Sequence, residues 1–379
     1  MSEPTVGTLE MGERGGGYLR TPDANYATRP SDVFVAPELC RTLRLRGGET
    51  IAGTARISNG RAGGKRTSGP ELVEVESING RSVEDHFEAV PLEDLTAIDP
   101  HEPIRLETPG GPETMRVIDL LTPIGFGQRG LIVASPRTGK TILLQQMANG
   151  VATNHPHAEV LMLLVDERPE EVTEMRRTVR GEVVFSSNDR DAMSHVRIAR
   201  LTIERAKRQV EAGRDVVLFL DSLTRLGRAF NTIVCGGGRI MSGGLDTRAL
   251  AEPKAVFGAA RKVEGGGSLT IMATALIDTG SRMDQVIFNE FKGTGNMEIM
   301  LSRELANMRI WPAIDLEASG TRKEEKLLTP AQLAAANHLR RTLQGRGPVR
   351  AMESLLDALR KHPTNATFVT ALATEGRLR

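Results

Sequence analysis

The sequence predicts a small all-β barrel followed by an α/β domain with a mostly parallel sheet, and three observations support this prediction. Residues 7–78 contain several short strand-like segments, which are bounded by Gly, Pro, Asn and Asp. From about residue 114, nearly continuous apolar runs alternate with helical patterns, as in a sheet covered on both faces. The stretch "IVASPRTGKTILLQ" at 132–145 places a basic, Gly-containing loop between a strand and a helix.

The N-terminal strands are expected at "GTLEM", "GGYLR", "DVFVAP", "TIAGTARIS" and "ELVEVESI". Five short strands in about 70 residues suit a five-stranded oligonucleotide-binding (OB) barrel. The following segment, 78–113, is acidic and rich in proline, and is interpreted as a connector. We therefore expect a barrel domain at 1–79, a connector at 80–112 and an α/β domain at 113–379.

In the α/β domain the apolar runs predict strands at 130–135, 159–167, 215–222, 266–278 and 296–305. Helical periodicity predicts helices at 140–154 and 194–213, the second of which ends at Gly213. We expect helices on both faces of the sheet, because its strands carry apolar residues almost without alternation.

Composition excludes several classes of protein. The chain has 379 residues, and 39% of them are hydrophobic, which favours globular domains over disorder. No apolar run approaches the roughly 20 residues of a membrane helix, and the N-terminus lacks the apolar centre of a signal peptide. The two cysteines, Cys40 and Cys235, lie far apart, which fits a reducing compartment. We expect a cytoplasmic protein that has no membrane partner.

Charge is divided unevenly along a chain whose net charge is +1. Residues 1–108 hold 12 Lys and Arg against 18 Asp and Glu, a net of −6, so the rest carries +7. Within the first part, residues 40–66 hold seven basic residues against one acid. A basic patch on an acidic domain can bind an anionic chain, although a solvated charged surface explains this charge pattern equally well.

The loop at 132–145 has the features of a phosphate-binding loop, with Ala134 at the place of the usual first glycine. Backbone N–H groups at the start of a helix can cradle a polyphosphate. Gly139 allows the tight turn, Lys140 can reach the β and γ phosphates, and the Thr141 hydroxyl can bind Mg²⁺. The residues expected to contact the nucleotide here are Pro136, Arg137, Thr138, Gly139, Lys140, Thr141 and Ile142.

Two acids follow buried strands and are expected beside this loop. Asp221 ends "VVLFLD" and Glu167 ends "VLMLLVDE", and the carboxyl ends of parallel strands meet at one edge of a sheet. Asp221 is expected to bind Mg²⁺, and Glu167 can polarise the attacking water. Arg322 is a further candidate for stabilising the transferred phosphoryl group, although a surface arginine in a charged loop is the simpler interpretation.

Five motifs in the second half resemble the Rho transcription termination factor family. They are "VDERPEEVTEM" (165–175), "LDSLTRLGRAFN" (220–231), "ALIDTGSRMDQVI" (275–287), "EFKGTGNMEIMLSR" (290–303) and "PAIDLEASGTRKEE" (312–325). The resemblance extends more weakly into the barrel through "GYLRTPDANY" and "PSDVFVAP". It implies a RecA-like P-loop ATPase domain behind an OB-fold, cold-shock-like barrel. It also implies a homohexameric ring helicase that is driven by ATP, moves along single-stranded RNA and acts with RNA polymerase.

The resemblance assigns further roles around the nucleotide. Lys140 and Thr141 would bind phosphate and Mg²⁺, Asp221 would bind Mg²⁺, and Glu167 would be the hydrolytic base. Arg168 and Arg225 resemble residues that sense the γ phosphate. Arg322 resembles an arginine finger that enters the neighbouring subunit's site, and Trp311 stands where the family has an aromatic that stacks on adenine. Ala134 and Arg137 fit the family, which shares the alanine and has a lysine at the second position.

For RNA, the resemblance points to two channel loops and to the barrel. The loops are 232–246 and 278–284, in which Arg239 and Arg282 are the expected phosphate contacts. In the barrel, Tyr18, Arg20 and Phe34 are expected to contact RNA. Gly16 stands where the family has a second aromatic, which implies weaker primary binding, so we expect Gly16→Phe to tighten it.

Two other functions stay open from the residues alone. A rotary or flagellar-type export ATPase subunit would share the sheet and the loop, but it would lack the RNA-binding barrel and the basic channel loops. A passive RNA-binding ring without turnover is the second alternative. The set of Lys140, Thr141, Glu167 and Asp221 argues against it.

Overall fold

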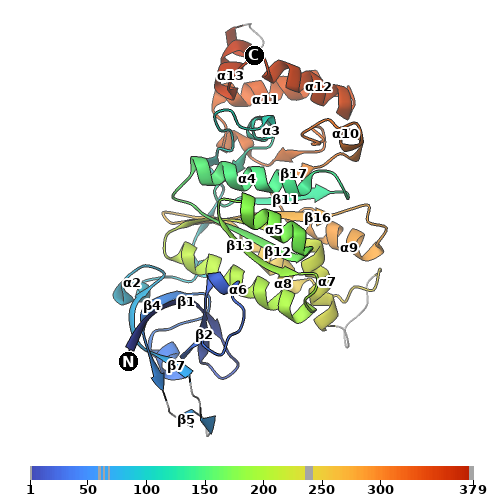
Figure 1. The fold of residues 1–379 in the computed structure, drawn as a ribbon. Coiled ribbons are helices and arrows are strands. Elements are labelled where there is room, and N and C mark those ends of the chain that lie inside the picture. Colours follow the sequence, from blue (N-terminus) through green and yellow to red (C-terminus); the bar gives the residue numbers. More distant parts are fainter. Residues whose placement is uncertain (1, 59–60, 63–64, 67–68, 235–241, 375–379) are drawn as a thin grey trace. The chain divides into compact units, whose positions relative to one another are not determined.

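The computed structural model describes residues 2–58, 61–62, 65–66, 69–234 and 242–374 (Figure 1). The chain forms two compact units. The first consists of residues up to Thr96 together with Val196–Arg214 and Glu264–Gly267. The second consists of Ala97–His195, Asp215–Val263 and the chain from Ser268 onward.

The first unit contains a closed barrel with the strand order β1-β2-β3-β7-β4. Its strands are β1 (Ser2–Met11), β2 (Gly17–Arg20), β3 (Val33–Val35), β4 (Thr50–Ser58) and β7 (Gly69–Ile78). Neighbours pair antiparallel except β3 and β7, which are parallel. The five predicted strands and the barrel are confirmed, although β1 begins five residues earlier than the sequence pattern predicts.

Successive side chains of these strands point alternately into and out of the barrel, and the inward-pointing ones form its core. The buried side chains include Leu9, Leu19, Val35, Ile51 and Ile78. The unit also holds η1 (Pro22–Ala24), α1 (Pro37–Thr42), the two-residue strands β5 (Arg61–Ala62) and β6 (Lys65–Arg66), α2 (Val83–Phe87), η2 (Leu92–Asp94) and most of α6 (Ala192–Glu211).

The second unit is built on a nine-stranded, mostly parallel sheet with the order β13-β12-β14-β16-β11-β17-β18 and two further edge strands. Its strands are β8 (Ala97–Ile98), β11 (Arg129–Ala134), β12 (Glu159–Glu167), β13 (Glu182–Ser187), β14 (Asp215–Asp221), β15 (Arg261–Val263), β16 (Ser268–Leu276), β17 (Met297–Met300) and β18 (Gly320–Thr321). The pair β9 (Pro103–Ile104) and β10 (Ile124–Gly125) is separate. The predicted mostly parallel α/β class is therefore confirmed.

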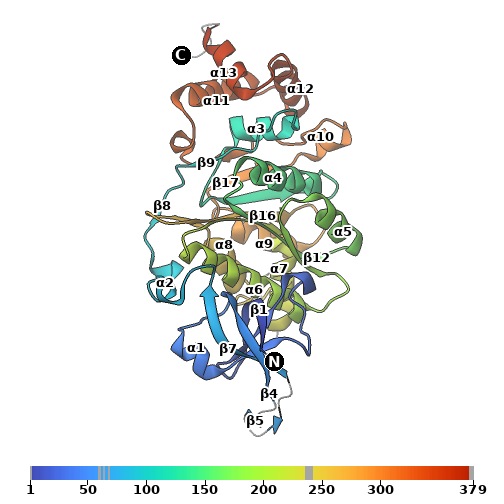
Figure 2. The ribbon, with the colours of Figure 1, turned by 60° about the vertical axis from the view of Figure 1, so that its left-hand side comes forward.

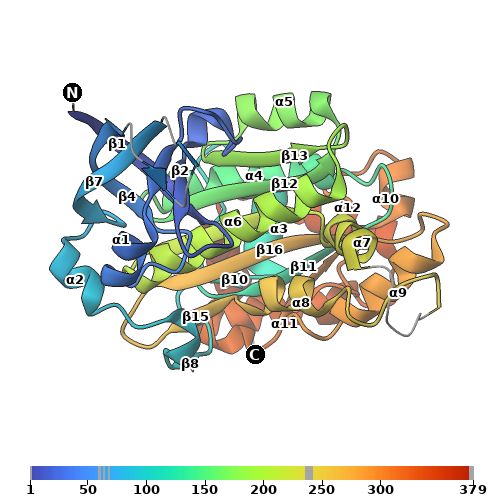
Figure 3. The same ribbon diagram turned by 90° about the horizontal axis from the view of Figure 1, so that it is seen from below.

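Helices cover both faces of this sheet (Figures 2 and 3). One face carries α4 (Lys140–Asn154) and α5 (Pro169–Thr178), and the opposite face carries α7 (Leu223–Val234), α8 (Ala251–Gly258) and α9 (Arg282–Phe291). Beyond α4 lie α3 (Glu113–Leu121), α10 (Arg303–Asn307), η3 (Glu324–Lys326), α11 (Pro330–Leu343), α12 (Pro348–Leu359) and α13 (Asn365–Thr374). None of the helices that the structure describes has the length and apolar character needed to cross a membrane.

The predicted strand at 296–305 is wrong beyond Met300. The strand stops there, and Ser302 caps a new helix, α10, by accepting a hydrogen bond from the Leu305 N–H at 3.3 Å. A serine directly before a helical turn, accepting from the N–H three residues later, is an N-cap signal that outweighs the apolar run. The segment 80–112, expected as a connector, carries α2, η2, β8 and β9.

Candidate nucleotide site and RNA-contact surfaces

The phosphate-binding loop joins the end of β11 at Ala134 to the start of α4 at Lys140. Two of its residues have left-handed backbone, Arg137 with φ +67° and Gly139 with φ +83°. The loop therefore turns sharply into the N-terminus of a 15-residue helix, where free N–H groups and the helix dipole favour an anion.

A hydroxyl group of the phosphate-binding loop stabilises its backbone. The buried Thr138 donates a hydrogen bond from Oγ1 to the Ser135 carbonyl at 2.7 Å. Pro136 and Arg137, between them, are exposed. The exposed residues are thus free to face a nucleotide while the backbone beneath them is held.

Lys140 brings the two predicted acids together. Its Nζ donates a 2.6 Å hydrogen bond to Asp221 Oδ1 and a 3.0 Å bond to Glu167 Oε1. Both carboxylate side chains are almost fully buried, at 2% and 3% exposure. Thr274 Oγ1 also donates to Asp221 Oδ1, at 2.7 Å. The carboxyl ends of β12 and β14 thus deliver their acids to the edge of the phosphate loop.

Burial and mutual charge set the protonation of this cluster. Burial, followed by the negative charge of Asp221, raises the pKa of Glu167 to about 7. Burial opposes the charge on Lys140, but Asp221 and Glu167 outweigh it and hold the pKa of that ammonium above its ordinary value. A carboxyl group with a pKa near neutrality exchanges a proton readily, which suits a general base.

A β-bulge aims Glu167. The register of β12 on β13 shifts between Val165 and Glu167, so Asp166 has no partner in the ladder. Asp166 has left-handed backbone with φ +58°, and the Asn188 N–H donates to the Glu167 carbonyl at 3.0 Å. Bulges of this kind re-direct side chains next to active sites. Nothing in the apolar run "VLMLLVDE" signals this bulge.

Two arginines lie around the same carboxylate. Arg225, on α7, places Nη2 3.4 Å from Glu167 Oε2 and Nη1 3.9 Å from Asp166 Oδ2. Arg168 follows Glu167 directly, is exposed, and occupies the N-cap position of α5. Both guanidinium groups are thus on elements that leave the sheet at its carboxyl edge.

The residues expected to hold Mg²⁺ fit that ion. Thr141, the second residue of α4, is half-buried, and Asp221 lies across the loop on Lys140. Asp221 and Glu167 already hold one positive charge, the Lys140 ammonium, which shows that this donor set favours a cation. No group of three or more His, Cys, Asp or Glu in the described chain could hold a metal unaided. Mg²⁺ in P-loop sites takes most of its ligands from phosphate and water.

Trp311 lies over the phosphate loop. A Cβ added to Gly139 would come within 2.6 Å of the Trp311 ring, so only glycine fits beneath it. The ring is 42% exposed and borders a cavity of about 220 Å³ together with Thr138, Ile142 and Leu143. Ile142 is itself 55% exposed. This arrangement offers an aromatic face and an aliphatic side chain to a planar base.

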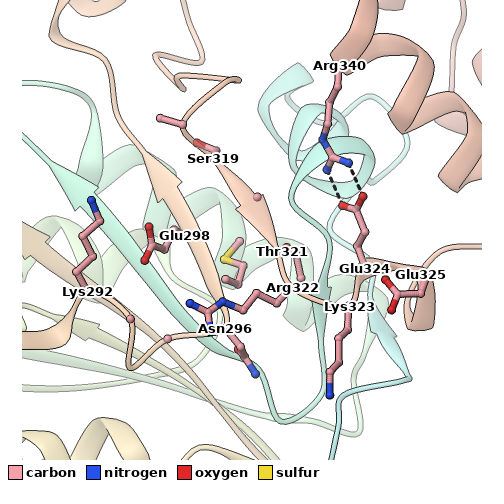
Figure 4. A pocket seen from close by; sticks show the side chains of 15 residues that line it. Lys292, Asn296, Glu298, Ser319, Thr321, Arg322, Lys323, Glu324, Glu325 and Arg340 are labelled. Atoms are coloured by element: carbon pink, nitrogen blue, oxygen red, sulfur yellow. Dashed lines mark hydrogen bonds and ion pairs between the residues drawn. The ribbon is translucent and has the colours of Figure 1, made fainter. Parts of the chain in front are cut away.

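Arg322 is not part of this cluster. It follows β18, whose Thr321 pairs with Met297, and Met297 is level with Gly130 near the start of β11. Arg322 is therefore at the amino edge of the sheet, opposite the phosphate loop. It is exposed and lines a cavity of about 680 Å³, whose wall includes Lys292 (Figure 4).

The two loops expected to contact RNA lie against each other. A Cβ added to Gly243 would be 2.7 Å from the Met283 backbone nitrogen. Asp284 anchors the second loop: it accepts hydrogen bonds from Arg228 at 2.7 and 2.6 Å and from Thr279 at 2.6 Å. Arg282 remains exposed at the start of α9. Arg239 lies outside the described residues.

Loop 278–284 is connected to the nucleotide site in two ways. Ser135 Oγ in the phosphate loop donates to Asp278 Oδ2 at 2.6 Å, at the start of loop 278–284. In addition, α7 carries both Arg225, which contacts Glu167, and Arg228, which holds Asp284, one turn further along. Sequence reasoning missed Ser135, Asp278 and Arg228, because their partners are distant in the chain and no local pattern marks them.

On the barrel, Tyr18 and Phe34 are cross-strand neighbours on β2 and β3. Their ring centroids are 5.4 Å apart and tilted by 58°. The Arg20 guanidinium lies 5.1 Å from the Tyr18 ring centroid and is held by Glu10, at 2.6 Å, and by Asp32. Tyr18 is 41% exposed, so this face offers stacking surface, whereas Arg20 is only 7% exposed and is neutralised by its two acidic partners.

The backbone around Gly16 argues against the expectation that Gly16→Phe tightens RNA binding. A Cβ at Gly16 would lie 2.8 Å from the Val35 carbonyl and 3.1 Å from the Pro37 ring. A side chain there would displace β3, which carries Phe34. Phe34 is the ring that pairs with Tyr18 on this face.

Comparison with known proteins assigns both parts of the chain. Residues 5–84 match the family described as "Rho termination factor, RNA-binding domain", and residues 114–321 match "ATP synthase alpha/beta family, nucleotide-binding domain". A transcription termination factor Rho from Cereibacter sphaeroides is 50% identical over 97% of this chain and 87% of that protein. One from Streptomyces coelicolor is 52% identical over 96% and 84%.

Solved structures share a large part of the fold. A prototypical ATPase from the type III secretion system of pathogenic bacteria is 25% identical, with a TM-score of 0.56, and the match covers 65% of this chain and 71% of that one.

Proposed function

Because the chain belongs to the transcription termination factor Rho family, we propose that it is an RNA-dependent ATPase and helicase that terminates transcription. One observation carries the proposal. A barrel of the Rho RNA-binding family, with Tyr18 and Phe34 on one face, is in the same chain as an ATPase site centred on Lys140. RNA binding and ATP use are therefore properties of one polypeptide.

The ATPase step follows from the cluster at the phosphate loop. The β and γ phosphates of ATP bind the loop N–H groups and draw the Lys140 ammonium away from Asp221 and Glu167. Glu167 then orients the attacking water and accepts its proton, for which a pKa of about 7 is well suited. Arg168 and Arg225 approach the γ phosphate from α5 and α7. The adenine stacks on Trp311 beside Ile142.

Mg²⁺ is part of this proposal, with Thr141 and Asp221 as its protein ligands. When bound, the ion neutralises charge on the β and γ phosphate oxygens. Thr141 contributes its hydroxyl and Asp221 a carboxylate that Thr274 already orients.

Subunit assembly is proposed from the position of Arg322. This residue lies at the amino edge of the sheet and cannot serve the Lys140 site of its own chain without crossing the sheet. It can serve as the arginine finger of an adjacent copy, as in the homohexameric ring that the family resemblance implies. Loops 232–246 and 278–284 then line the channel, where Arg239 and Arg282 contact the phosphates of single-stranded RNA.

RNA polymerase is the proposed partner and the cytoplasm the proposed location, because a termination factor acts on a nascent transcript. An export-type ATPase is the competing function, favoured by the shared fold of the second unit. The barrel favours RNA as the activating ligand.

The test is ATP hydrolysis by the purified full chain, with and without poly-pyrimidine RNA, at fixed salt. The proposal predicts that turnover rises steeply with RNA and disappears in Lys140→Ala. Turnover that ignores RNA would favour the export-type ATPase, and RNA binding without turnover would favour a passive ring.

A further inference from the structure

We propose that His195 is a positioning residue for ATP hydrolysis: through Asp166 it fixes the bulge that aims Glu167. The inference rests on the proposed ATPase function and assigns a task to a buried histidine that the phosphate-loop chemistry does not use. His195 lies on α6, and only 6% of its surface is exposed.

The two ring nitrogens of His195 face different partners. Nδ1 is 2.7 Å from Ser186 Oγ, a hydroxyl on β13 that is itself 5% exposed. Nε2 lies 3.9 Å from Asp166 Oδ1. When the Ser186 hydroxyl donates to Nδ1, the imidazole proton is on Nε2, directed to the carboxylate. Burial lowers the pKa of His195, which favours this neutral form.

Asp166 is the residue through which such a contact affects catalysis. It is the unpaired residue of the bulge, with φ +58°, and it comes directly before Glu167. A left-handed backbone is unfavourable for a residue with a Cβ and persists only when its surroundings hold it. Two groups flank the Asp166 carboxylate without a direct hydrogen bond: His195 Nε2 lies 3.9 Å from Oδ1, and Arg225 Nη1 lies 3.9 Å from Oδ2.

Arg225 links the position of Asp166 to that of Glu167. The same guanidinium lies 3.4 Å from Glu167 and 3.9 Å from Asp166, so the two acids share it. Without His195, Asp166 moves onto Arg225 and draws that cation from Glu167. The charged groups that act on His195 are Asp166, Asp191, Asp189 and Arg225, and of these Asp166 acts most strongly.

A simpler reading is that the Ser186–His195 hydrogen bond only joins β13 to α6. Two matched variants separate the readings. In His195→Asn, the amide occupies the place of Nδ1 and keeps a partner for Ser186, but the group facing Asp166 is lost. In His195→Gln, the amide reaches the place of Nε2 and keeps a partner for Asp166.

The experiment measures kcat and KM for ATP with saturating poly-pyrimidine RNA, together with Tm, for wild type, His195→Asn, His195→Gln and Glu167→Gln. We expect His195→Asn to lower kcat by about tenfold or more, because small misplacements of catalytic groups have effects of this size or larger. Its KM for ATP and its Tm stay close to wild type, since Trp311 and the phosphate loop are untouched. His195→Gln is expected to keep most of the wild-type kcat but to have a lower Tm than wild type.

The opposite ranking, with His195→Gln impaired and His195→Asn active, overturns the proposal in favour of a purely structural bond. Wild-type kcat in both variants also overturns it. If neither variant folds, half-exposed Asp166→Asn replaces them, and wild-type kcat in that variant is then decisive against the proposal. Absence of RNA-stimulated turnover in wild type refutes the proposed function itself, whereas an active wild type and an inactive Glu167→Gln leave that function standing.

Discussion

Lys140 Nζ lies 2.6 Å from Asp221 Oδ1, so the cation of the phosphate loop is held by the carboxylate that ends β14, a strand separated from β11 by β16. The same ammonium is 3.0 Å from Glu167. One positive charge therefore serves two buried acids, and a bound polyphosphate competes with both for it. This shared charge links nucleotide binding to the ionisation of Glu167, the proposed hydrolytic base.

Lys140→Ala is expected to lower ATP turnover by at least about 100-fold, since a positioned charge is removed from the phosphate groups. It also leaves Asp221 and Glu167 buried without their cation, so Tm falls. Removing one partner of a buried ion pair costs about 3–5 kcal/mol, less here because Glu167 can take up a proton. RNA binding by the barrel at fixed salt is the control and stays unchanged. Near-normal turnover would refute the assignment.

Activity is expected to rise with pH through about 7. Burial and Asp221 raise the pKa of Glu167 to about 7, so below this pH the residue is protonated and cannot accept a proton from water. Above it the carboxylate is present and kcat/KM for ATP levels off. The measurement is a pH profile of kcat/KM at constant ionic strength. A flat profile from pH 5.5 to 8 would show that Glu167 is not the limiting base.

Arg322→Ala and Lys140→Ala are each expected to be inactive alone, but to restore activity when mixed. Arg322 is at the opposite edge of the sheet from Lys140, so the arginine finger that we propose for each site comes from another subunit. A mixed assembly contains interfaces with an intact Lys140 on one copy and an intact Arg322 on the other. The loss for Arg322→Ala is about 1,000-fold or more. Mixtures without recovered RNA-stimulated hydrolysis, after subunit exchange is verified, argue against a shared site.

Trp311→Ala is expected to raise KM for ATP by about tenfold, with a smaller change in kcat, because aromatic stacking contributes about 0.5–1.5 kcal/mol beyond the area it buries. Trp311→Phe is the matched control and retains most of the affinity. The ring lies over Gly139, 42% exposed, at the mouth of the cavity. Unchanged KM values for both variants would place the base elsewhere.

Tyr18→Ala and Phe34→Ala are each expected to weaken binding of poly-pyrimidine RNA by about 1–3 kcal/mol, since every base that stacks contributes about this amount. Phe87→Ala is the control, because this ring on α2 is similarly exposed at 41% and lies under Arg44 instead. Affinities must be compared at one salt concentration. Equal losses in all three variants would indicate a general effect on the barrel.

Much of this protein follows from local patterns. Apolar runs without alternation predict buried parallel strands, and turn residues at short intervals predict the barrel. Both signals can be read because they depend only on residues a few positions apart in the sequence. The phosphate loop and the acids Glu167 and Asp221 follow as well, since parallel topology places strand ends at one edge. At 296–305 the apolar strand pattern competes with the N-cap signal of Ser302. The prediction of a strand over this whole range failed because Ser302 starts a helix there.

Only the tertiary structure decided which distant residues meet. The bulge at Asp166, the Ser135–Asp278 bond and the Arg228–Asp284 pair depend on backbone register and on packing between elements far apart in sequence. The same holds for Gly16, whose backbone approaches the Val35 carbonyl too closely for any side chain. Sequence determined the fold class, the loop and the acids, because periodicity is local. Structure decided the aim of Glu167, because three-dimensional packing sets it.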